Sequence, residues 1–228
     1  QDGAQGGRCH PLTAIDDHSR YAVCLAACPD EQGKTVQDRL VAVFRRHGLP
    51  DAIFVDNGNP WGDSRGGRWT AFSVWLLKLG VDVLHARPYH PQSRGKNERF
   101  HRTLKAEVMA LRTFRSLRET QRAFDAWRDV YNHERPHEAL GQDTPASRYQ
   151  ASTRAMPERI RPIEYDEGEI VRIVSSTRAS VRFKGRLWPV PRAFHGERLA
   201  IRPCGRDGQF GIFFASRQIA SIDLTKQP

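Results

Sequence analysis

The sequence predicts an α/β domain followed by a small all-β barrel. Up to about residue 85, short apolar runs alternate with segments of helical period, which is typical of a layered α/β fold with a parallel portion. From residue 169 the pattern changes to short alternating runs separated by glycine-containing turns, which favours a small antiparallel barrel. With 228 residues, 39% of them hydrophobic, the chain can build one ordinary core and a small second one.

The first part of the chain gives strands and helices in a regular order. A turn-rich segment beginning at Asp16 separates the first two strands, and Gly48 and Gly80 end the two helices that follow. The fourth expected element is a short, continuous apolar run, as buried parallel strands often are. The expected ranges are strands at 12–15 and 20–25, a helix at 34–47, a strand at 51–55, a helix at 69–79 and a strand at 81–85.

Two more helices are expected after a proline-bounded loop at 87–92. In the first of these helices, apolar residues recur at helical spacing and form one stripe. The second helix spans about 117–133 and carries a stripe of its own. The first stripe consists of Phe100, Leu104, Val108 and Leu111, and the second of Phe124, Trp127 and Tyr131. Because helical spacing indicates packing, we interpret the aromatic residues of the second stripe as core residues.

Prolines and glycines between residues 136 and 162 interrupt the regular pattern. We therefore expect a first domain at 1–150, a linker at 151–168 and the barrel at 169–228. The barrel strands are expected at 170–174, 180–183, 187–190, 198–202, 210–214 and 219–222.

The net charge of +10 is unevenly distributed. Residues 87–135 hold 12 basic and 6 acidic residues, and residues 154–228 hold 14 and 8, so each segment carries +6. The rest of the chain is nearly neutral. Confinement of the excess to a helical stretch and the C-terminal quarter indicates a side that faces a polyanion, although solvated basic surfaces would give the same composition.

Several classes of protein are disfavoured by composition. No run approaches the roughly 20 apolar residues needed to span a bilayer, so no membrane partner is expected. The polar N-terminus lacks both a signal-peptide layout and an initiator Met, so we expect the chain to be a piece of a longer protein. Its four cysteines form no Cys-x-x-Cys pair and no zinc-ligand spacing, which favours a reduced, cytoplasmic setting.

Two carboxylates stand where chemistry on a phosphodiester would need them. Asp56 ends the apolar strand at 51–55 and precedes Asn57-Gly58, a turn that exposes its side chain. Glu98 lies in the first turn of a strongly basic helix. Each has a plain structural explanation, since Asp before Asn-Gly forms turns and an acidic residue favours a helix N-terminus. Together, beside a row of cations, they favour metal-assisted chemistry.

Two long motifs resemble the catalytic core of insertion-sequence transposases in the retroviral-integrase superfamily. They are Phe54-Val55-Asp56-Asn57-Gly58 and the run from Arg87-Pro88-Tyr89-His90-Pro91-Gln92 through Asn97-Glu98-Arg99-Phe100-His101 to Leu104-Lys105. Tyr131-Asn132-His133-Glu134-Arg135-Pro136-His137 and Thr144-Pro145-Ala146 are also similar to that group. The resemblance covers about residues 8–150. It implies a ribonuclease-H-like core, a mixed sheet flanked by helices, and some members carry a small C-terminal β-barrel.

The resemblance implies a catalytic Asp, Asp, Glu triad that binds two Mg²⁺ or Mn²⁺ ions. Asp56 corresponds to the second acid and Glu98 to the third, and both would be catalytic and metal-binding. The 41 residues between them slightly exceed the commonest family spacing. The first acid is expected upstream of Gln1. Asp16 is an alternative for it, but its place at the strand turn favours a role in the hairpin.

The resemblance and the local charge also suggest residues that contact DNA. Arg102 and Lys105 lie four and seven positions after Glu98, so they share its helix face and could hold phosphates, although a solvated face would have the same pattern. The remaining candidates lie in or just after the preceding loop: Tyr89, His90, Gln92, Arg94 and Lys96. Basic residues of the barrel suggest salt-sensitive binding to the DNA backbone; these are Arg172, Arg178, Arg182, Lys184 and Arg186.

The leading hypothesis is a transposase or integrase that cleaves donor DNA ends and joins them to target DNA by two-metal transesterification. A catalytically incomplete DNA-binding remnant and a purely hydrolytic ribonuclease-H-like nuclease stay open as alternatives. The expected partner is DNA, both element ends and target. Joining two ends favours a homo-oligomer, and the expected location is the bacterial cytoplasm, at the nucleoid.

Overall fold

A computed structural model describes residues 9–55, 58, 60–62, 69–85 and 95–226. The chain divides into two compact units, each made of two separate stretches of sequence. Unit 1 comprises residues 1–50 and 85–156, and unit 2 comprises residues 51–84 and 157–228. Each unit is described below by itself.

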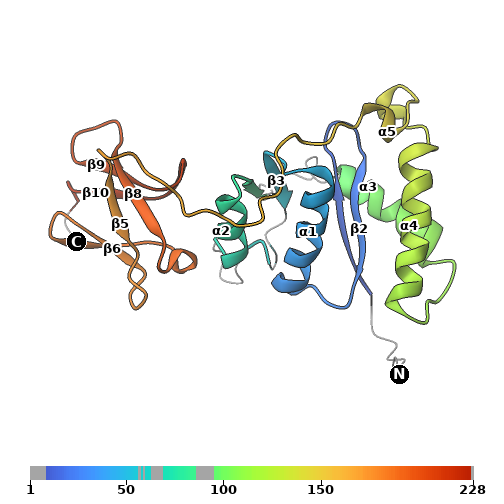
Figure 1. Ribbon diagram of the computed structural model, residues 1–228, viewed down its shortest axis with the longest axis horizontal. Coiled ribbons are helices and arrows are strands. Elements are labelled where there is room, and N and C mark those ends of the chain that lie inside the picture. The colour runs from blue at the N-terminus through green and yellow to red at the C-terminus, as the bar shows by residue number, and fades with distance from the viewer. Residues whose placement is uncertain (1–8, 56–57, 59, 63–68, 86–94, 227–228) are drawn as a thin grey trace. The chain divides into compact units, whose positions relative to one another are not determined.

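Unit 1 is built on an antiparallel hairpin of β1 (His10–Ile15) and β2 (Ala22–Cys28) (Figure 1). The register pairs Leu12 with Ala26, and it shifts after Ala14. The turn is closed by a 2.8 Å hydrogen bond from the Asp16 N–H to the Tyr21 carbonyl. This confirms the two strands that the sequence predicts.

Helices cover both faces of this hairpin. Because side chains alternate along a strand, Cys24, Ala26 and Cys28 of β2 lie on one face, where Val43 of α1 (Gly33–His47) packs against them. Leu25 and other residues of β2 face the opposite way, toward α3 (Gly95–Leu104) and α4 (Leu117–His133). The result is a layered α/β arrangement, which confirms the predicted class and the aromatic stripe of α4 as core.

The stripe predicted for α3 is correct at three of its four positions. Phe100, Leu104 and Val108 are buried, but Leu111 is 74% exposed. The helix continues beyond Leu104 as one π-helical turn, Lys105–Met109, and ends there. Leu111 therefore follows the helix end, and the helical period no longer turns it toward the core.

The C-terminal end of unit 1 returns to the end of α1. After a short 3₁₀ turn (Glu138–Leu140) and α5 (Pro145–Arg148), Tyr149 stacks on Tyr21 with ring centroids 4.2 Å apart. Its hydroxyl also hydrogen-bonds His47 Nδ1 at 3.0 Å. Backbone bonds from Ser152 N–H to the His47 carbonyl (2.9 Å) and from Leu49 N–H to the Arg154 carbonyl (2.7 Å) complete the contact. We call residues 149–154 the return segment.

Unit 2 begins with β3 (Ala52–Val55), α2 (Ala71–Lys78) and β4 (Asp82–His85), of which the last residue is assigned to unit 1. The two strands form a two-stranded sheet. A capping box starts α2, in which Thr70 Oγ1 accepts from the Ser73 N–H and Ser73 Oγ accepts from the Thr70 N–H. These elements match the three expected between residues 51 and 85.

The remainder of unit 2 is antiparallel β structure. β5 (Ile170–Ile173), β8 (Arg198–Pro203), β9 (Gln209–Phe214) and β10 (Arg217–Asp223) form a sheet in the order β10-β9-β8-β5. β6 (Ser180–Phe183) and β7 (Arg186–Pro189) form a hairpin, and a 3₁₀ turn (Arg192–Phe194) leads to β8. All six predicted strands are present, and closure into a barrel stays a prediction.

The core of unit 2 draws on both of its stretches. Phe194, Ile212 and Phe214 are fully buried in it, and Val74 and Leu77 of α2 pack into the same cluster. The two compact units therefore do not coincide with the predicted domains at 1–150 and 169–228. The predicted domain boundaries stay a prediction. In the described ranges, no helix is both long and apolar enough to cross a membrane.

Candidate functional site

The structure describes one of the two predicted catalytic acids. Glu98 lies in the first turn of α3, and its side chain is exposed. Asp56 lies outside the described residues, as do Tyr89, His90, Gln92 and Arg94; it directly follows Val55, the last residue of β3. The pairing of Asp56 with Glu98 therefore stays a prediction.

The amphipathic character of α3 sets the exposure of Glu98. Phe100 and Leu104 are each 2% exposed and fix the buried side of the helix. Glu98, Arg102 and Lys105 are exposed, and their spacing of four and three residues places them on a shared face. Within the described residues Glu98 makes no ion pair. The exposed carboxylate of Glu98 therefore shares its helix face with two positive side chains.

Lys96 is engaged differently from the other predicted DNA contacts. Its ammonium nitrogen lies 2.5 Å from Asp17 Oδ1 and 3.2 Å from the Asp17 carbonyl, in the turn between β1 and β2. Both partners are accessible to solvent. The pair ties the start of α3 to the hairpin turn, and a DNA phosphate would have to compete with Asp17 for this lysine.

Asp16 has the role of a turn residue. Its Oδ2 accepts hydrogen bonds from the Ser19 N–H (2.8 Å) and the Ser19 hydroxyl (2.7 Å), and Ser19 is fully buried. Such bonds from a side-chain oxygen to the backbone two or three residues on stabilise turns. The hairpin interpretation therefore has a direct structural basis.

Metal ligands do not cluster among the described residues, where no group of three or more His, Cys, Asp or Glu could hold an ion. Asp56 falls outside that set. The oxygen chemistry of the available donor fits Mg²⁺ or Mn²⁺, which prefer carboxylates. The Cys24 thiol is unsuited, since burial raises its pKa to about 12 and keeps it protonated.

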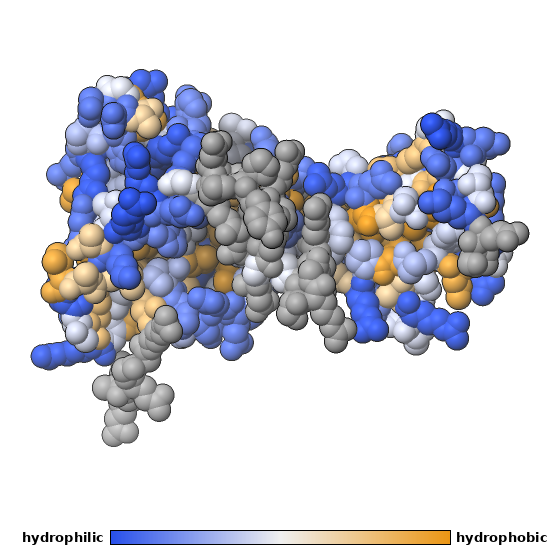
Figure 2. Space-filling model, turned by 180° about the vertical axis from the view of Figure 1, so that it is seen from behind, coloured by the Kyte–Doolittle hydropathy of each residue, from blue (hydrophilic) through white to orange (hydrophobic). Residues whose placement is uncertain are grey.

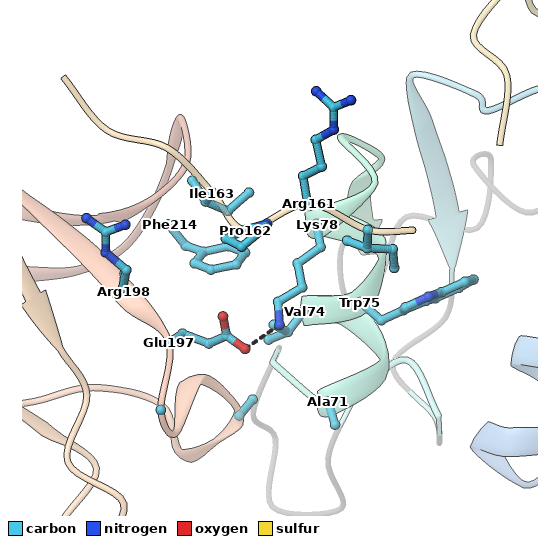
Figure 3. A pocket seen from close by; sticks show the side chains of 13 residues that line it. Ala71, Val74, Trp75, Lys78, Arg161, Pro162, Ile163, Glu197, Arg198 and Phe214 are labelled. Carbon is cyan, nitrogen blue, oxygen red and sulfur yellow. Dashed lines mark hydrogen bonds and ion pairs between the residues drawn. The ribbon is translucent and has the colours of Figure 1, made fainter. Parts of the chain in front are cut away.

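Unit 2 contains a cleft of about 600 Å³, between α2, residues 160–163 and the loop before β8 (Figure 3). Lys78, Arg161 and Arg198 line it together with one carboxylate, Glu197, which pairs with Lys78 at 2.5 Å. Phe214 provides an apolar wall. A single carboxylate already paired with a lysine does not make a metal site, and the other lining residues named here are cationic or apolar.

The five basic residues predicted to bind DNA in unit 2 are all exposed: Arg172, Arg178, Arg182, Lys184 and Arg186. On the face shown in Figure 2, hydrophilic residues predominate, and hydrophobic ones lie in separate areas between them. A polar, cationic surface of this kind suits a polyanionic partner better than an apolar one.

The sequence does not predict one ion pair of unit 1. Glu107 and Arg135 form an ion pair at 2.5 Å, between the π-helical turn and the residues after α4. They are 28 residues apart, so no local spacing connects them. The tryptophan between them, Trp127, is predicted as a core residue, which gives no indication that its indole N–H binds Glu107.

Comparisons with known proteins cover most of the chain. Residues 2–91 and 79–145 match two family models, each described as an integrase core domain. Residues 169–228 match the C-terminal domain of IS481 family transposases.

Two curated relatives come from bacterial insertion elements. The insertion element IS476 uncharacterized 39.2 kDa protein of Xanthomonas euvesicatoria is 31% identical over 161 residues, covering 68% of this chain and 44% of that protein. The insertion element IS407 uncharacterized 31.7 kDa protein of Burkholderia multivorans is 30% identical over 152 residues, covering 67% and 52%. The chain thus spans about half the length of these relatives.

Among solved structures, the catalytic core domain of BIV integrase is 22% identical, with a TM-score of 0.46 over 61% of this chain and 89% of that one. The simian T-cell lymphotropic virus intasome in complex with the PP2A regulatory subunit B56 gamma is 15% identical, with a TM-score of 0.47 over 96% and 74%. Likenesses of this degree concern the backbone alone and carry no argument about activity.

Proposed function

We propose that the chain, which matches integrase core domain models and the C-terminal domain model of IS481 family transposases, is an insertion-sequence transposase that cleaves the DNA ends of a mobile element and joins them to target DNA. The observation that carries the proposal is the exposed carboxylate of Glu98 on a helix whose same face presents Arg102 and Lys105. An acid beside two cations is the arrangement needed to hold a metal ion and a phosphodiester together.

In the proposed site, Asp56 and Glu98 would bind the catalytic metal through their carboxylate oxygens. Two Mg²⁺ or Mn²⁺ ions, when bound, supply activation of the attacking oxygen and stabilisation of the leaving 3′-oxygen. In the sequence Asp56 directly follows β3, and Glu98 lies in the first turn of α3.

The cationic residues of α3 bind and orient the DNA in this proposal. Arg102 and Lys105, one and two turns after Glu98, hold phosphates next to the reacting bond. Lys96 contacts DNA only after release from Asp17, and Tyr89, His90, Gln92 and Arg94 position the DNA end. The exposed arginines of unit 2 add sequence-independent affinity for the backbone.

Strand transfer requires two element ends, so the proposed working form is a homo-oligomer on DNA, in the bacterial cytoplasm. Hydrolysis without joining would make the protein a nuclease, and DNA binding without cleavage would make it an inactive remnant. These outcomes differ in their products, which allows one assay to separate them.

The test uses the full-length protein with a labelled element end, target DNA and Mn²⁺. We expect nicking and joined products from the unsubstituted protein, and neither from Asp56→Asn or Glu98→Gln, while both variants still bind DNA. Asp129→Asn, which alters an exposed carboxylate of α4, serves as the matched control and should keep full activity. Nicked products without joining indicate the nuclease. Full activity in either catalytic variant would refute the site.

A further inference from the structure

The end of α3 departs from ordinary helical geometry. Residues Lys105–Met109 form a π-helical turn, closed by a 2.8 Å hydrogen bond from the Ala110 N–H to the Lys105 carbonyl. Such single turns are rare in helices and are frequent at functional sites. Here the wider turn keeps Val108 buried while Glu107 contacts α4.

Glu107 receives two hydrogen bonds on one oxygen. Its Oε2 accepts from the indole N–H of Trp127 at 2.7 Å and from the guanidinium of Arg135 at 2.5 Å. The bond from Arg135 and, after it, that from Trp127 hold the pKa of the Glu107 carboxyl below its usual range. The carboxylate is therefore charged at neutral pH and binds two groups that come from α4 and the residues after it.

Arg135 makes cation–π contacts as well as the ion pair. Its guanidinium carbon lies 5.7 Å from the Trp127 ring centroid and 5.9 Å from that of Tyr131. The two rings are themselves stacked, with centroids 5.1 Å apart. A planar guanidinium can lie over an aromatic face and donate N–H hydrogen bonds in its own plane at the same time. The ammonium of a lysine cannot do both.

The same aromatic pair holds α3 next to Glu98. Phe100, two residues after Glu98 and 2% exposed, meets Trp127 and Tyr131 edge-to-face with centroids 5.3 and 5.0 Å apart. Glu107 bonds to Trp127 and Arg135 lies over both rings, so the ion pair contacts the same two rings that Phe100 meets. The rotation of α3 about its own axis is thereby set by α4.

A second contact links α3 to β1. His101 Nε2, three residues after Glu98, lies 2.6 Å from the Thr13 hydroxyl of β1. A helix held by Phe100 on one side and by His101 on another has little freedom to rotate. This matters because a side-chain group about 6 Å from the helix axis moves about 1 Å for a rotation of about 10°. Metal–ligand distances tolerate only about 0.2 Å.

We propose that Glu107 and Arg135, with Trp127 between them, form a clamp that positions α3 so that Glu98 meets the catalytic metal. Glu107 and Arg135 are positioning residues in this inference, since they act through Phe100 and the helix. The part of the inference that concerns the metal rests on the proposed function. The part that concerns the hold on α3 does not.

The first measurement is the Mn²⁺ concentration that gives half-maximal DNA cleavage by the full-length protein. Residues that orient a metal ligand typically change metal affinity by about 10-fold or more when replaced, so we expect a rise of about 10-fold in Glu107→Gln and in Arg135→Gln. The double variant should show no further rise, because both substitutions break one pair. The KM for DNA should stay unchanged. Arg135→Lys is a milder variant, because it keeps the positive charge and removes the planar guanidinium.

The matched control is Arg148→Gln, which breaks an ion pair of similar length with Asp143 (2.6 Å) in the same unit, away from α3. It should leave the Mn²⁺ dependence unchanged. An unchanged Mn²⁺ dependence in Glu107→Gln or Arg135→Gln overturns the clamp, even if the maximal rate falls, because a merely structural role lowers only the active fraction.

The second measurement separates the clamp from the proposed function. Amide hydrogen exchange across residues 98–104, in the metal-free protein, should be faster in Arg135→Gln than in Arg148→Gln. Equal exchange in the two variants overturns the hold on α3. If the unsubstituted protein fails to cleave DNA but the exchange result is as expected, the proposed function fails and the hold on α3 stands.

Discussion

Replacing Gly48 by alanine should destabilise unit 1 through its backbone rather than through lost contacts. Gly48 ends α1 with φ +78° and ψ 171°, a region open essentially to glycine alone. A Cβ at this position would lie 2.3 Å from the Ser152 carbonyl oxygen and 2.9 Å from the Ser152 carbonyl carbon. Both the local conformation and the return segment would have to change.

The expected magnitude follows from these two effects. Backbone conformations of this kind cost about 1–3 kcal/mol for a residue with a side chain. Moving Ser152 also strains the bonds from Ser152 N–H to His47 and from Leu49 N–H to Arg154, each contributing about 1 kcal/mol. The free energy of unfolding of unit 1 should therefore fall by about 2–4 kcal/mol.

Two other glycines provide graded controls for a urea unfolding series followed by circular dichroism. Gly141 has φ +68° but no atom within 4 Å of the position that an alanine methyl would occupy, so Gly141→Ala should cost only the backbone term, about 1–2 kcal/mol. Gly95 has neither feature and begins α3, so Gly95→Ala should be neutral or stabilising.

Amide exchange localises the effect. The N–H groups of Leu49 and Ser152 should lose protection in Gly48→Ala and keep it in Gly141→Ala. If Gly48→Ala and Gly141→Ala cost the same, and Ser152 stays protected, then the close approach of the return segment to Gly48 is wrong.

Two further predictions concern unit 1. Burial lowers the pKa of His47, and the charges of Arg46 and Arg128 lower it further. The folded state therefore binds a proton at His47 less readily than the unfolded chain does. The contribution of neutral His47 to the free energy of unfolding is fully present above about pH 6.5, and it is lost as the pH falls through the lowered pKa of the folded state. Urea midpoints at about pH 7.5 and about pH 5.5 measure the loss, and His47→Gln should reduce it; an equal loss in the variant would contradict the assignment. Asn132→Ala should cost about 1–3 kcal/mol in the same assay, because it strands the buried Ala22 N–H, which donates to Asn132 Oδ1 at 2.8 Å; a change below about 0.5 kcal/mol would contradict it.

Long helices and short strands were accessible from the sequence because their period is repeated several times. The ranges expected for α1 and α4 agree with those observed, and all six C-terminal strands were found from alternation and glycine turns. The error at Leu111 has a local cause. Spacing alone cannot show that a helix ends at Met109 after a π-helical turn, so the predicted stripe contains one residue too many.

Contacts between distant segments were not accessible. Val74 and Leu77 are apolar at helical spacing, which predicts that they are buried but not that they join the core of the C-terminal sheet. Similarly, the pair of Glu107 and Arg135 exists only because α3 and α4 pack side by side. Sequence periodicity determines which face of an element is buried, whereas the partner of that face depends on the whole chain.

The candidate site was predicted from motifs. Glu98, the predicted catalytic acid that the structure describes, lies on the kind of element that was expected. Glu98 lies on the predicted helix and is exposed, with Arg102 and Lys105 on its face. The identity of a metal ligand depends on what its oxygens meet in space, which a motif can suggest only through resemblance. The meeting of Asp56 and Glu98 is accordingly the central claim.

Anomalous diffraction from crystals of the full-length protein grown with Mn²⁺ tests that claim most directly. We predict that at least one Mn²⁺ peak lies about 2.1 Å from carboxylate oxygens of both Asp56 and Glu98, and that this peak is lost in Glu98→Gln. A Mn²⁺ ion bound by one of these residues without the other, or by neither, would contradict the proposed site.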